Sequence, residues 1–232
     1  MRVRDRNWMQ IEALLKSGED RAVLPLGSIE QHAYLSLAVD ALLAEQIAVD
    51  AAEPLGVPVF PAQPYGFTPT YMAYPGTLTL RLQTLLAVLA DLIGSLHHHG
   101  FRRVLIVNGH GGNNGAASLA QELMAQHAGL RVRWHNWWAA PRTMAFVRAH
   151  DPASSHASWM ENFASTRLAG IAMPSAPKPL VDYAHMALLD PPAKRAYLGD
   201  GCYGGAYEAP ADVSDRLWAI GIEETREAIA DW

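Results

Sequence analysis

Side chains that bind divalent cations gather in two short segments, each directly after an apolar run. The first contains Glu30 and His32, and Asp40 follows where a helical pattern begins. Because Glu30 and His32 are two residues apart in an extended segment, their side chains point to the same side. The second segment, Asn108 to Asn113, contains His110. Carboxylates and imidazoles are ligands of Zn²⁺ and Mn²⁺, so this pattern indicates a metal site.

Each of these segments also has an explanation without a metal. Glu30 and His32 are compatible with a solvated turn, and Asp40 is compatible with the N-cap of a helix. The segment Asn108 to Asn113 is compatible with a structural turn or with a backbone nest for an anion. It matches neither the Walker pattern nor the dinucleotide-binding fingerprint, which argues against a nucleotide site. Glu161, near an expected helix start, is a further candidate ligand.

The elements that must position these residues follow from the hydrophobic pattern. Short apolar runs predict strands at residues 22–26, 57–61, 103–107 and 130–134. Helical spacing predicts helices at residues 40–52, 79–99, 115–126 and 213–231, and a further helix that begins near Ser158. This alternation predicts an α/β fold, a three-layer α/β/α domain with a mostly parallel sheet. In such a sheet the polar segments lie at the carboxyl ends of strands, where ligands bind.

Composition and charge narrow the class of protein. The chain has 232 residues, of which 50% are hydrophobic, and we expect a single domain over residues 1–232. A net charge of −5 without a basic stripe argues against nucleic acid and anionic membranes as partners. The single cysteine, Cys202, excludes a disulfide framework and a cysteine-based metal site. The polar N-terminus and the lack of a bilayer-length apolar run lead us to expect a cytoplasmic protein.

Taken together, the motifs resemble the creatininase family of metal-dependent amidohydrolases. The hallmarks of that family are GxxEQHG, YG…FPGT, NGH(G)GN and HAGxxE segments. In this chain they correspond to Gly27–Ala33, Tyr65–Gly66 with Tyr74–Thr77, Asn108–Asn113, and His156–Glu161. Four segments in the family's order make the resemblance specific, and they imply a creatininase-like fold.

The resemblance implies a dinuclear centre that holds two divalent metal ions, zinc or manganese, bridged by Asp40. Carried over to this chain, the ligand sets are Glu30, Asp40 and His110 for one ion, and His32, Asp40 and Glu161 for the other. Creatininase proper takes its last carboxylate from the position two residues after the motif histidine. This chain has Gly112 there, so we expect Glu161 to replace that carboxylate.

The resemblance also implies a mechanism. His156 matches a histidine that the family places near the substrate, and we expect it to shuttle protons with a pKa near neutrality. The expected reaction is attack of a metal-activated hydroxide on an amide-like carbonyl, with cleavage of the C–N bond. We expect Tyr65, Thr68, Gly111 and Trp138 to contact the substrate.

Several departures from the family concern the substrate. Tyr71 stands where relatives commonly carry a histidine, and the span from Glu30 to Asp40 is shortened. Pro152 to Ser155 replace a tryptophan–aspartate pair that precedes the catalytic histidine of creatininase proper. Because the ligands are kept while the substrate wall differs, we expect a small polar cyclic amide or formamide as the substrate and not creatinine.

Two other functions stay open on the sequence alone. One is hydrolytic ring opening at a carbon–carbon bond of a cyclic dicarbonyl sugar or inositol derivative, and the other is a non-catalytic metal-binding subunit. The resemblance further implies a homo-oligomer, commonly a hexamer. Apolar side chains within residues 173–210 favour packing of this stretch against a neighbouring chain. The alternative is that the stretch folds back over its own sheet as a lid.

Overall fold

A parallel sheet of three strands forms the centre of the computed structural model, which describes residues 1–232. The strands are β1 (Arg21–Leu26), β2 (Arg103–Asn108) and β3 (Arg131–Asn136), in the order β1-β2-β3. Leu24 lies opposite Ile106, which in turn lies opposite Trp134. The runs of β1 and β2 are almost continuously apolar, as expected for parallel strands that are buried on both faces.

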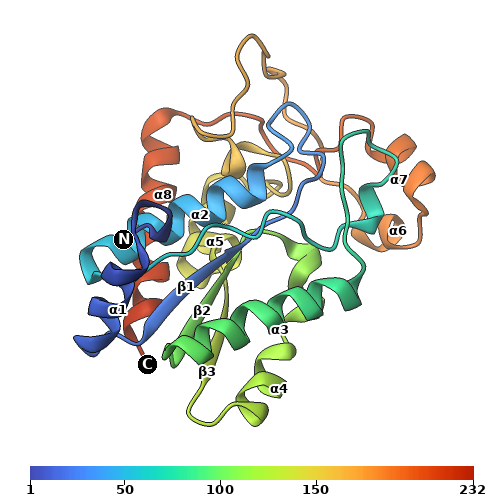
Figure 1. The fold of residues 1–232 in the computed structure, drawn as a ribbon. Helices are drawn as coiled ribbons and strands as arrows, with labels where there is room; N and C mark the ends of the chain where they lie inside the picture. The colour runs from blue at the N-terminus through green and yellow to red at the C-terminus, as the bar shows by residue number, and fades with distance from the viewer.

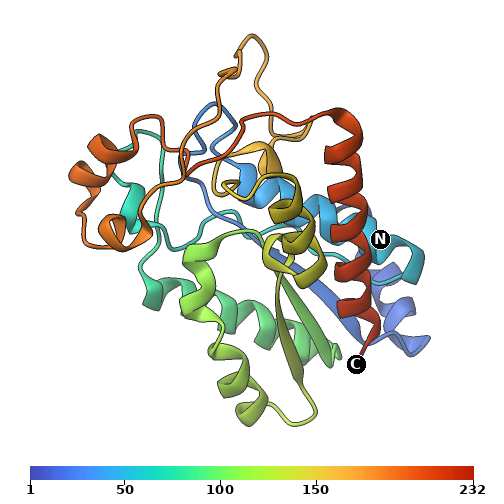
Figure 2. The same cartoon turned by 180° about the vertical axis from the view of Figure 1, so that it is seen from behind.

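Helices cover both faces of the sheet (Figures 1 and 2). Leu24 and Ile106 pack with α1 (Trp8–Lys16), α3 (Leu82–His99) and α4 (Leu119–Gln126). Val23 and Leu105 point to the opposite face, where they pack with α2 (Val39–Ala52) and α8 (Ala211–Ala230). α5 (Pro141–His150) packs against α8. The predicted α/β fold with a parallel sheet between helical layers is therefore confirmed. None of the helices combines the length and apolarity needed to span a membrane.

The predicted strand at residues 57–61 is wrong as a regular strand. The segment runs beside β1, where the Val23 N–H donates to the Pro58 carbonyl and the Phe60 N–H donates to the Val23 carbonyl, both at 2.9 Å. Only isolated bridges form, however, such as the one between Val23 and Val59. Pro58 and Pro61 lack an N–H group, so a continuous ladder of hydrogen bonds cannot develop.

The long periodic patterns predicted the helices best. The patterns at 40–52, 79–99 and 213–231 correspond to α2, α3 and α8, while the pattern at 115–126 forms a 3-10 turn (Gly111–Ala116) followed by α4. The helix predicted near Ser158 is wrong, since only a 3-10 turn (Trp159–Glu161) forms there. α1 and α5 were not predicted. Their start signals are a capping box at Asn7 with Gln10, and Pro141 at the first helical position.

The stretch 173–210 folds over the carboxyl edge of its own sheet, as the alternative reading proposed. It contains two short helices, α6 (Tyr183–Ala187) and α7 (Pro191–Leu198), capped by Asp182 and Asp190. Met186 and Leu198 are buried against the body of the same chain. Tyr183, Leu188 and Tyr197 of the same stretch stay exposed, so its packing against a neighbouring chain stays a prediction.

Candidate metal centre and active site

Three segments bring the candidate ligands together at the carboxyl edge of the sheet. Glu30 follows β1, His110 follows β2, and Asp40 lies in the first turn of α2. A Cβ atom at Gly109 would lie only 2.3 Å from the Asp40 carbonyl oxygen, and one at Gly27 only 2.4 Å from the Ala41 Cα. The two glycines therefore let the start of α2 approach the strand ends closely enough for Asp40 to reach the other ligands.

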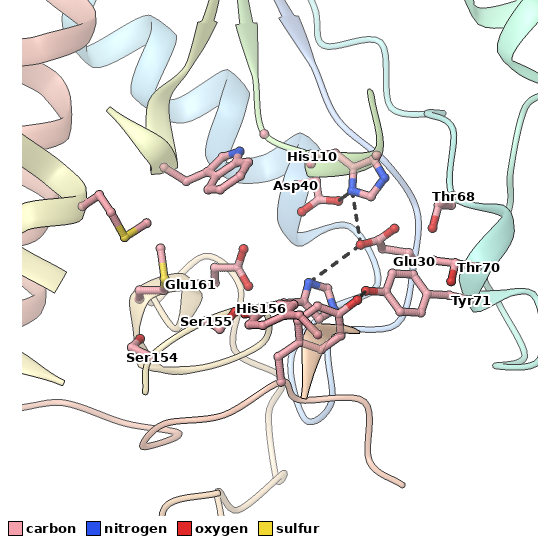
Figure 3. A pocket seen from close by; sticks show the side chains of 18 of the residues that line it. Glu30, Asp40, Thr68, Thr70, Tyr71, His110, Ser154, Ser155, His156 and Glu161 are labelled. Carbon is pink, nitrogen blue, oxygen red and sulfur yellow. Dashed lines mark hydrogen bonds and ion pairs between the residues drawn. The ribbon is translucent and has the colours of Figure 1, made fainter. Parts of the chain in front are cut away.

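Half-site A consists of Glu30, Asp40 and His110. The His110 Nδ1 atom lies 3.2 Å from a Glu30 carboxylate oxygen and 3.1 Å from Asp40 Oδ2. The opposite ring nitrogen of His110 donates to the Phe67 carbonyl at 3.1 Å, which turns Nδ1 toward the carboxylates. Figure 3 shows these three side chains pointing toward one another.

Half-site B consists of His32, Asp40 and Glu161. The His32 Nε2 atom lies 3.0 Å from Asp40 Oδ1 and 3.8 Å from a Glu161 oxygen. The His32 Nδ1–H donates to the Glu30 carbonyl at 3.2 Å, so Nε2 is the free ring nitrogen. Asp40 thus presents one carboxylate oxygen to each half-site, which is the arrangement of a bridging ligand.

The buried atoms of these side chains fit divalent cations. Glu30 Oε2, His32 Nε2 and Asp40 Oδ2 are inaccessible to solvent and have no hydrogen-bond partner. Such orphaned atoms are costly in a protein interior. Two imidazoles and three carboxylates, each at most 9% exposed, form two sets of donors in which the ligand atoms lie within 4.8 Å of one another. Nitrogen and oxygen donors of this kind suit zinc or manganese.

The pKa shifts of these side chains indicate which protons the cations would displace. Burial opposes a positive charge on His32, but Asp40 and Glu161 outweigh it and raise the pKa of His32 to about 10. Burial likewise opposes the charged form of Asp40, yet His32 and His110 hold the pKa of that carboxyl well below its usual range. Burial raises the pKa of Glu161 to about 7. Burial likewise opposes a positive charge on His110, but Glu30 and Asp40 hold its pKa well above the ordinary value. Without cations, protons on the two histidines therefore compensate part of the negative charge of the three carboxylates.

Glu161 reaches half-site B through an unusual turn. Ala157 has φ of 62°, a left-handed conformation that side chains other than glycine rarely adopt. Its N–H donates to a Glu161 carboxylate oxygen at 2.6 Å. The turn is anchored from outside, because the Trp159 N–H donates to the Ala206 carbonyl at 2.8 Å. This local geometry explains why a 3-10 turn forms here in place of the predicted helix.

His156 lies beside half-site A. Its Nδ1 atom is 3.9 Å from a Glu30 carboxylate oxygen, while its Nε2 atom lies 2.9 Å from the Gln31 side-chain nitrogen and 3.1 Å from the Gln31 carbonyl oxygen. The expected titration near neutrality is wrong for this structure. Burial, together with the nearby charge on His32, holds the pKa of His156 well below its ordinary value, so the ring is neutral.

A cavity of about 580 Å³ opens onto these residues. Thr68, Gly111 and Trp138 line it, and the Thr68 hydroxyl is buried without a hydrogen-bond partner. Tyr65 does not line the cavity, and it is 44% exposed on the surface. The structure therefore does not bring this predicted substrate-binding residue to the site.

Other lining residues were not singled out as site residues from the sequence. They are Tyr71, Arg148, Ser154, Leu180, Tyr183 and Tyr203, among others. Three of them carried a sequence signal: Tyr71 and Ser154 lie at departures from the family pattern, and Tyr203 lies within a glycine-rich segment at residues 201–205. The others come from α5 and from the stretch 173–210, whose path over the site is not encoded locally.

Comparison with known proteins agrees with this geometry. The model of the creatininase family, described as creatinine amidohydrolase, matches residues 4–229. The chain belongs to the creatininase family. Among curated relatives it is 33% identical over 114 residues to creatinine amidohydrolase of Pseudomonas putida, and 31% identical over 119 residues to the mycofactocin precursor peptide peptidase of Mycolicibacterium smegmatis. These matches cover 47% and 48% of this creatininase-family chain and less than half of each relative, 44% and 47%.

Solved structures of creatininase share the fold over nearly the whole chain. A tryptophan-to-phenylalanine mutant creatininase superposes with a TM-score of 0.82 at 22% identity, covering 99% of this chain and 98% of the mutant. A structure named creatininase Mn has a TM-score of 0.79 at 23% identity, and one named a Zn-Zn type mutant has 0.77 at 22% identity. Each of these two covers 99% of this chain and 97% of its own.

Proposed function

We propose that this creatininase-family protein is a metal-dependent hydrolase that cleaves an amide-like C–N bond in a small polar substrate. The observation that carries the proposal is the position of Asp40, whose two carboxylate oxygens face His32 on one side and His110 on the other. A buried carboxylate shared by two sets of nitrogen and oxygen donors is suited to bridging two cations. The proposed cofactors are two divalent ions, zinc or manganese.

The relatives support both parts of the proposal. The curated relatives are named as an amidohydrolase and a peptide peptidase, and both names describe cleavage of C–N bonds. The related structures named as manganese and zinc–zinc forms support the choice of metals. The family resemblance implies a carboxylate at the position of Gly112, whereas a Cβ atom there in this chain would lie only 2.3 Å from both His110 Nε2 and the Phe67 carbonyl oxygen.

The chain's own residues divide the chemical work. When bound, two divalent cations lower the pKa of water, polarise the substrate carbonyl and stabilise negative charge on its oxygen. The Nε2 atom of His156 lies 3.1 Å from the Gln31 carbonyl oxygen, which leaves Nδ1 facing Glu30 to take a proton from the attacking water and to deliver it to the leaving nitrogen. The Thr68 hydroxyl, buried and unpaired at the cavity wall, is available to bind the substrate.

The cavity supports a small substrate with a polar and an apolar end. A volume of about 580 Å³ lies within the range that holds small ligands. Trp138, Met144, Met160 and Leu180 provide apolar surface in the wall of the cavity. We propose cyclic amides, formamides and short peptides as the substrate class, and not creatinine itself.

A metal-dependent activity screen tests the proposed function. The purified protein is stripped with a chelator, reloaded with Zn²⁺ or Mn²⁺, and assayed on lactams, N-formyl compounds, short peptides and creatinine. We expect hydrolysis of at least one amide, with activity lost in the stripped protein and restored by the ion. A protein that binds two ions per chain and yet hydrolyses none of these amides would contradict the proposal.

We also propose that the protein forms a closed homo-oligomer, as its family resemblance implies. Large apolar side chains stay exposed, among them Trp8 at 71% and Leu188 at 86%. Burial of such side chains between copies of the chain is favourable. Light scattering at micromolar concentration should give a mass several times 25.3 kDa, the mass of one chain. A mass of one chain that persists at higher concentration contradicts this proposal.

A further inference from the structure

Two tyrosine hydroxyls meet at the wall of the active-site cavity. Tyr71 ends a 3-10 turn (Pro69–Tyr71), and Tyr203 belongs to the glycine-rich segment at residues 201–205. Both side chains line the cavity, and their hydroxyl groups are hydrogen-bonded to each other although the residues are 132 positions apart. Tyr71 is only 4% exposed. The pair is therefore a built feature of the interior and not a chance contact on the surface.

A count of protons shows that the Tyr71–Tyr203 pair can donate one hydrogen bond to a third group. Each phenol carries one proton at neutral pH, because the ordinary pKa of tyrosine is about 10. The bond between Tyr71 and Tyr203 uses one of the two protons, and neither hydroxyl has another hydrogen-bond partner in the protein. The second proton has no protein acceptor, and both side chains line the cavity, so this proton is available to a molecule bound there.

The neighbours of the pair place that donor next to the reacting groups. The Tyr71 ring stacks on the His156 ring, with centroids 5.3 Å apart and an angle of 8° between the planes. The Tyr203 ring lies 4.9 Å from the same imidazole. His156 in turn faces Glu30 of half-site A through its Nδ1 atom, and both tyrosines line the same cavity as these two residues. Figure 3 shows Tyr71, His156 and Glu30 beside one another.

We propose that Tyr71 and Tyr203 act as one hydroxyl pair that donates a hydrogen bond to the substrate oxygen on which negative charge develops. This inference rests on the proposed hydrolase function and adds two catalytic residues to it. Attack by water forms a C–O bond while the carbonyl π electrons move to the carbonyl oxygen. The pair stabilises that oxygen without giving up its proton. As the electrons return, the C–N bond breaks and the nitrogen takes its proton from His156.

Substitution by phenylalanine separates the hydroxyls from the rings. Tyr71→Phe and Tyr203→Phe keep the aromatic contacts with His156 and each remove one hydroxyl, so we expect unchanged thermal stability and metal content. Tyr74→Phe is the matched control, because Tyr74 packs edge-on against Tyr71 but does not line the cavity. The double variant has no phenol proton left, so we expect its kcat on the best amide of the screen to fall about 10- to 100-fold, with little change in KM. Either single variant should lose less, because the remaining phenol still has one proton to donate.

A binding measurement makes the test independent of the substrate. Inorganic phosphate, a tetrahedral oxyanion, is titrated by calorimetry into the metal-loaded wild type, the double variant of Tyr71 and Tyr203, and Tyr74→Phe. We expect its Kd to rise about tenfold or more in the double variant, and to stay unchanged in Tyr74→Phe. If the double variant keeps wild-type phosphate affinity and kcat, the hydroxyl pair is overturned while the hydrolase function stands. If phosphate binding depends on the pair but no amide is hydrolysed, the pair stands and the proposed function fails.

Discussion

The two half-sites of the candidate metal centre are built in different ways. Half-site A takes Glu30, Asp40 and His110 from the ends of β1 and β2 and from the first turn of α2, all of which are anchored in the buried sheet layer. Half-site B shares Asp40 but depends on Glu161, which a strained turn at Ala157 presents from outside the sheet. One half-site is thus part of the framework, and the other is completed by a loop.

This difference distinguishes ligands with fixed positions from a ligand whose position can vary. The positions of ligands at strand ends are fixed by the same hydrophobic packing that makes the fold. A ligand supplied by a loop can move to another position of the chain while the fold stays the same. The family resemblance implies a last carboxylate in the segment after β2, at the position where this chain has Gly112. In this chain the candidate for that carboxylate is Glu161, which comes from the loop.

The largest effect is expected at the residue that the half-sites share. Asp40→Asn keeps the size of the side chain but removes the bridging charge, so both ions should be lost and kcat should fall by at least about 10⁴-fold. Elemental analysis after dialysis measures the metal content, and the screen substrate measures the rate. Full metal content and activity in this variant would show that Asp40 does not bridge.

The next effect concerns the histidine that borders half-site A without belonging to either ligand set. His156→Ala should keep both ions and lower kcat by about 10²- to 10⁴-fold, because proton transfer at Nδ1 is lost. The positions of Glu30, His32 and His156 would also allow this ring to bind a metal. Loss of an ion from His156→Ala would therefore move it into the ligand set.

Glu161→Gln tests half-site B alone. The amide keeps the shape of the side chain and removes its charge, so we expect one ion per chain in place of two and a rate reduced about 100-fold. Half-site A should keep its affinity, since the contacts of His110 with Glu30 and Asp40 do not involve the loop. Retention of two ions would require a different carboxylate in half-site B.

Gly112→Ala tests the hydrogen bond that orients the His110 ring in half-site A. The new Cβ atom would lie 2.3 Å from both His110 Nε2 and the Phe67 carbonyl oxygen, so the hydrogen bond that orients the ring must break. We expect about 10- to 100-fold weaker binding at half-site A, the range typical for loss of such a supporting contact. Gly115→Ala in the same turn is the control, because its Cβ atom meets only Leu82 at 3.7 Å. Equal metal affinity in the two variants would contradict the prediction.

The smallest expected effect is a difference in proton release. Side chains that bind a metal must be deprotonated, so each ion displaces the proton of the histidine in its half-site. In half-site A this histidine is His110, whose pKa is raised well above its ordinary value. In half-site B it is His32, whose pKa is raised to about 10. Glu161, whose pKa burial raises to about 7, adds to the protons released at half-site B. Zinc titration in buffers of different ionisation enthalpy should therefore give a larger proton release at half-site B than at half-site A.

The sign of the pH dependence follows from the same groups. Metal affinity should fall as the pH falls, and below pH 7 it should fall more steeply at half-site B because Glu161 also protonates. In the metal-free protein, the raised pKa of His32 contributes stability that is present below pH 6.5 and lost as the pH rises toward 10. The alternative outcome, an equal pH slope for the two half-sites, would show that Glu161 does not gain its charge on binding.

The sequence by itself determined the features that depend on local patterns. Alternating apolar runs and helical periodicity predicted β1 to β3, α2, α3 and α8, because a strand or long helix must present an apolar surface to the core. The motif residues Glu30, His32, Asp40 and His110 were also accessible from the sequence, since each lies within a few residues of an element that could be predicted. Their convergence follows from the rule that parallel strands end at one edge of a sheet.

Only the tertiary structure decided the features that depend on distant parts of the chain. Tyr71 and Tyr203 meet across 132 residues because the stretch 173–210 folds over the site, and no local pattern encodes that path. The neutral state of His156 follows from burial among groups from other segments, which overrides its ordinary pKa. Hydrogen bonds with the Glu161 carboxylate and with the Ala206 carbonyl offset the strain of the Ala157 backbone in this turn. Such features arise from long-range packing, whose energy is not a property of any short segment.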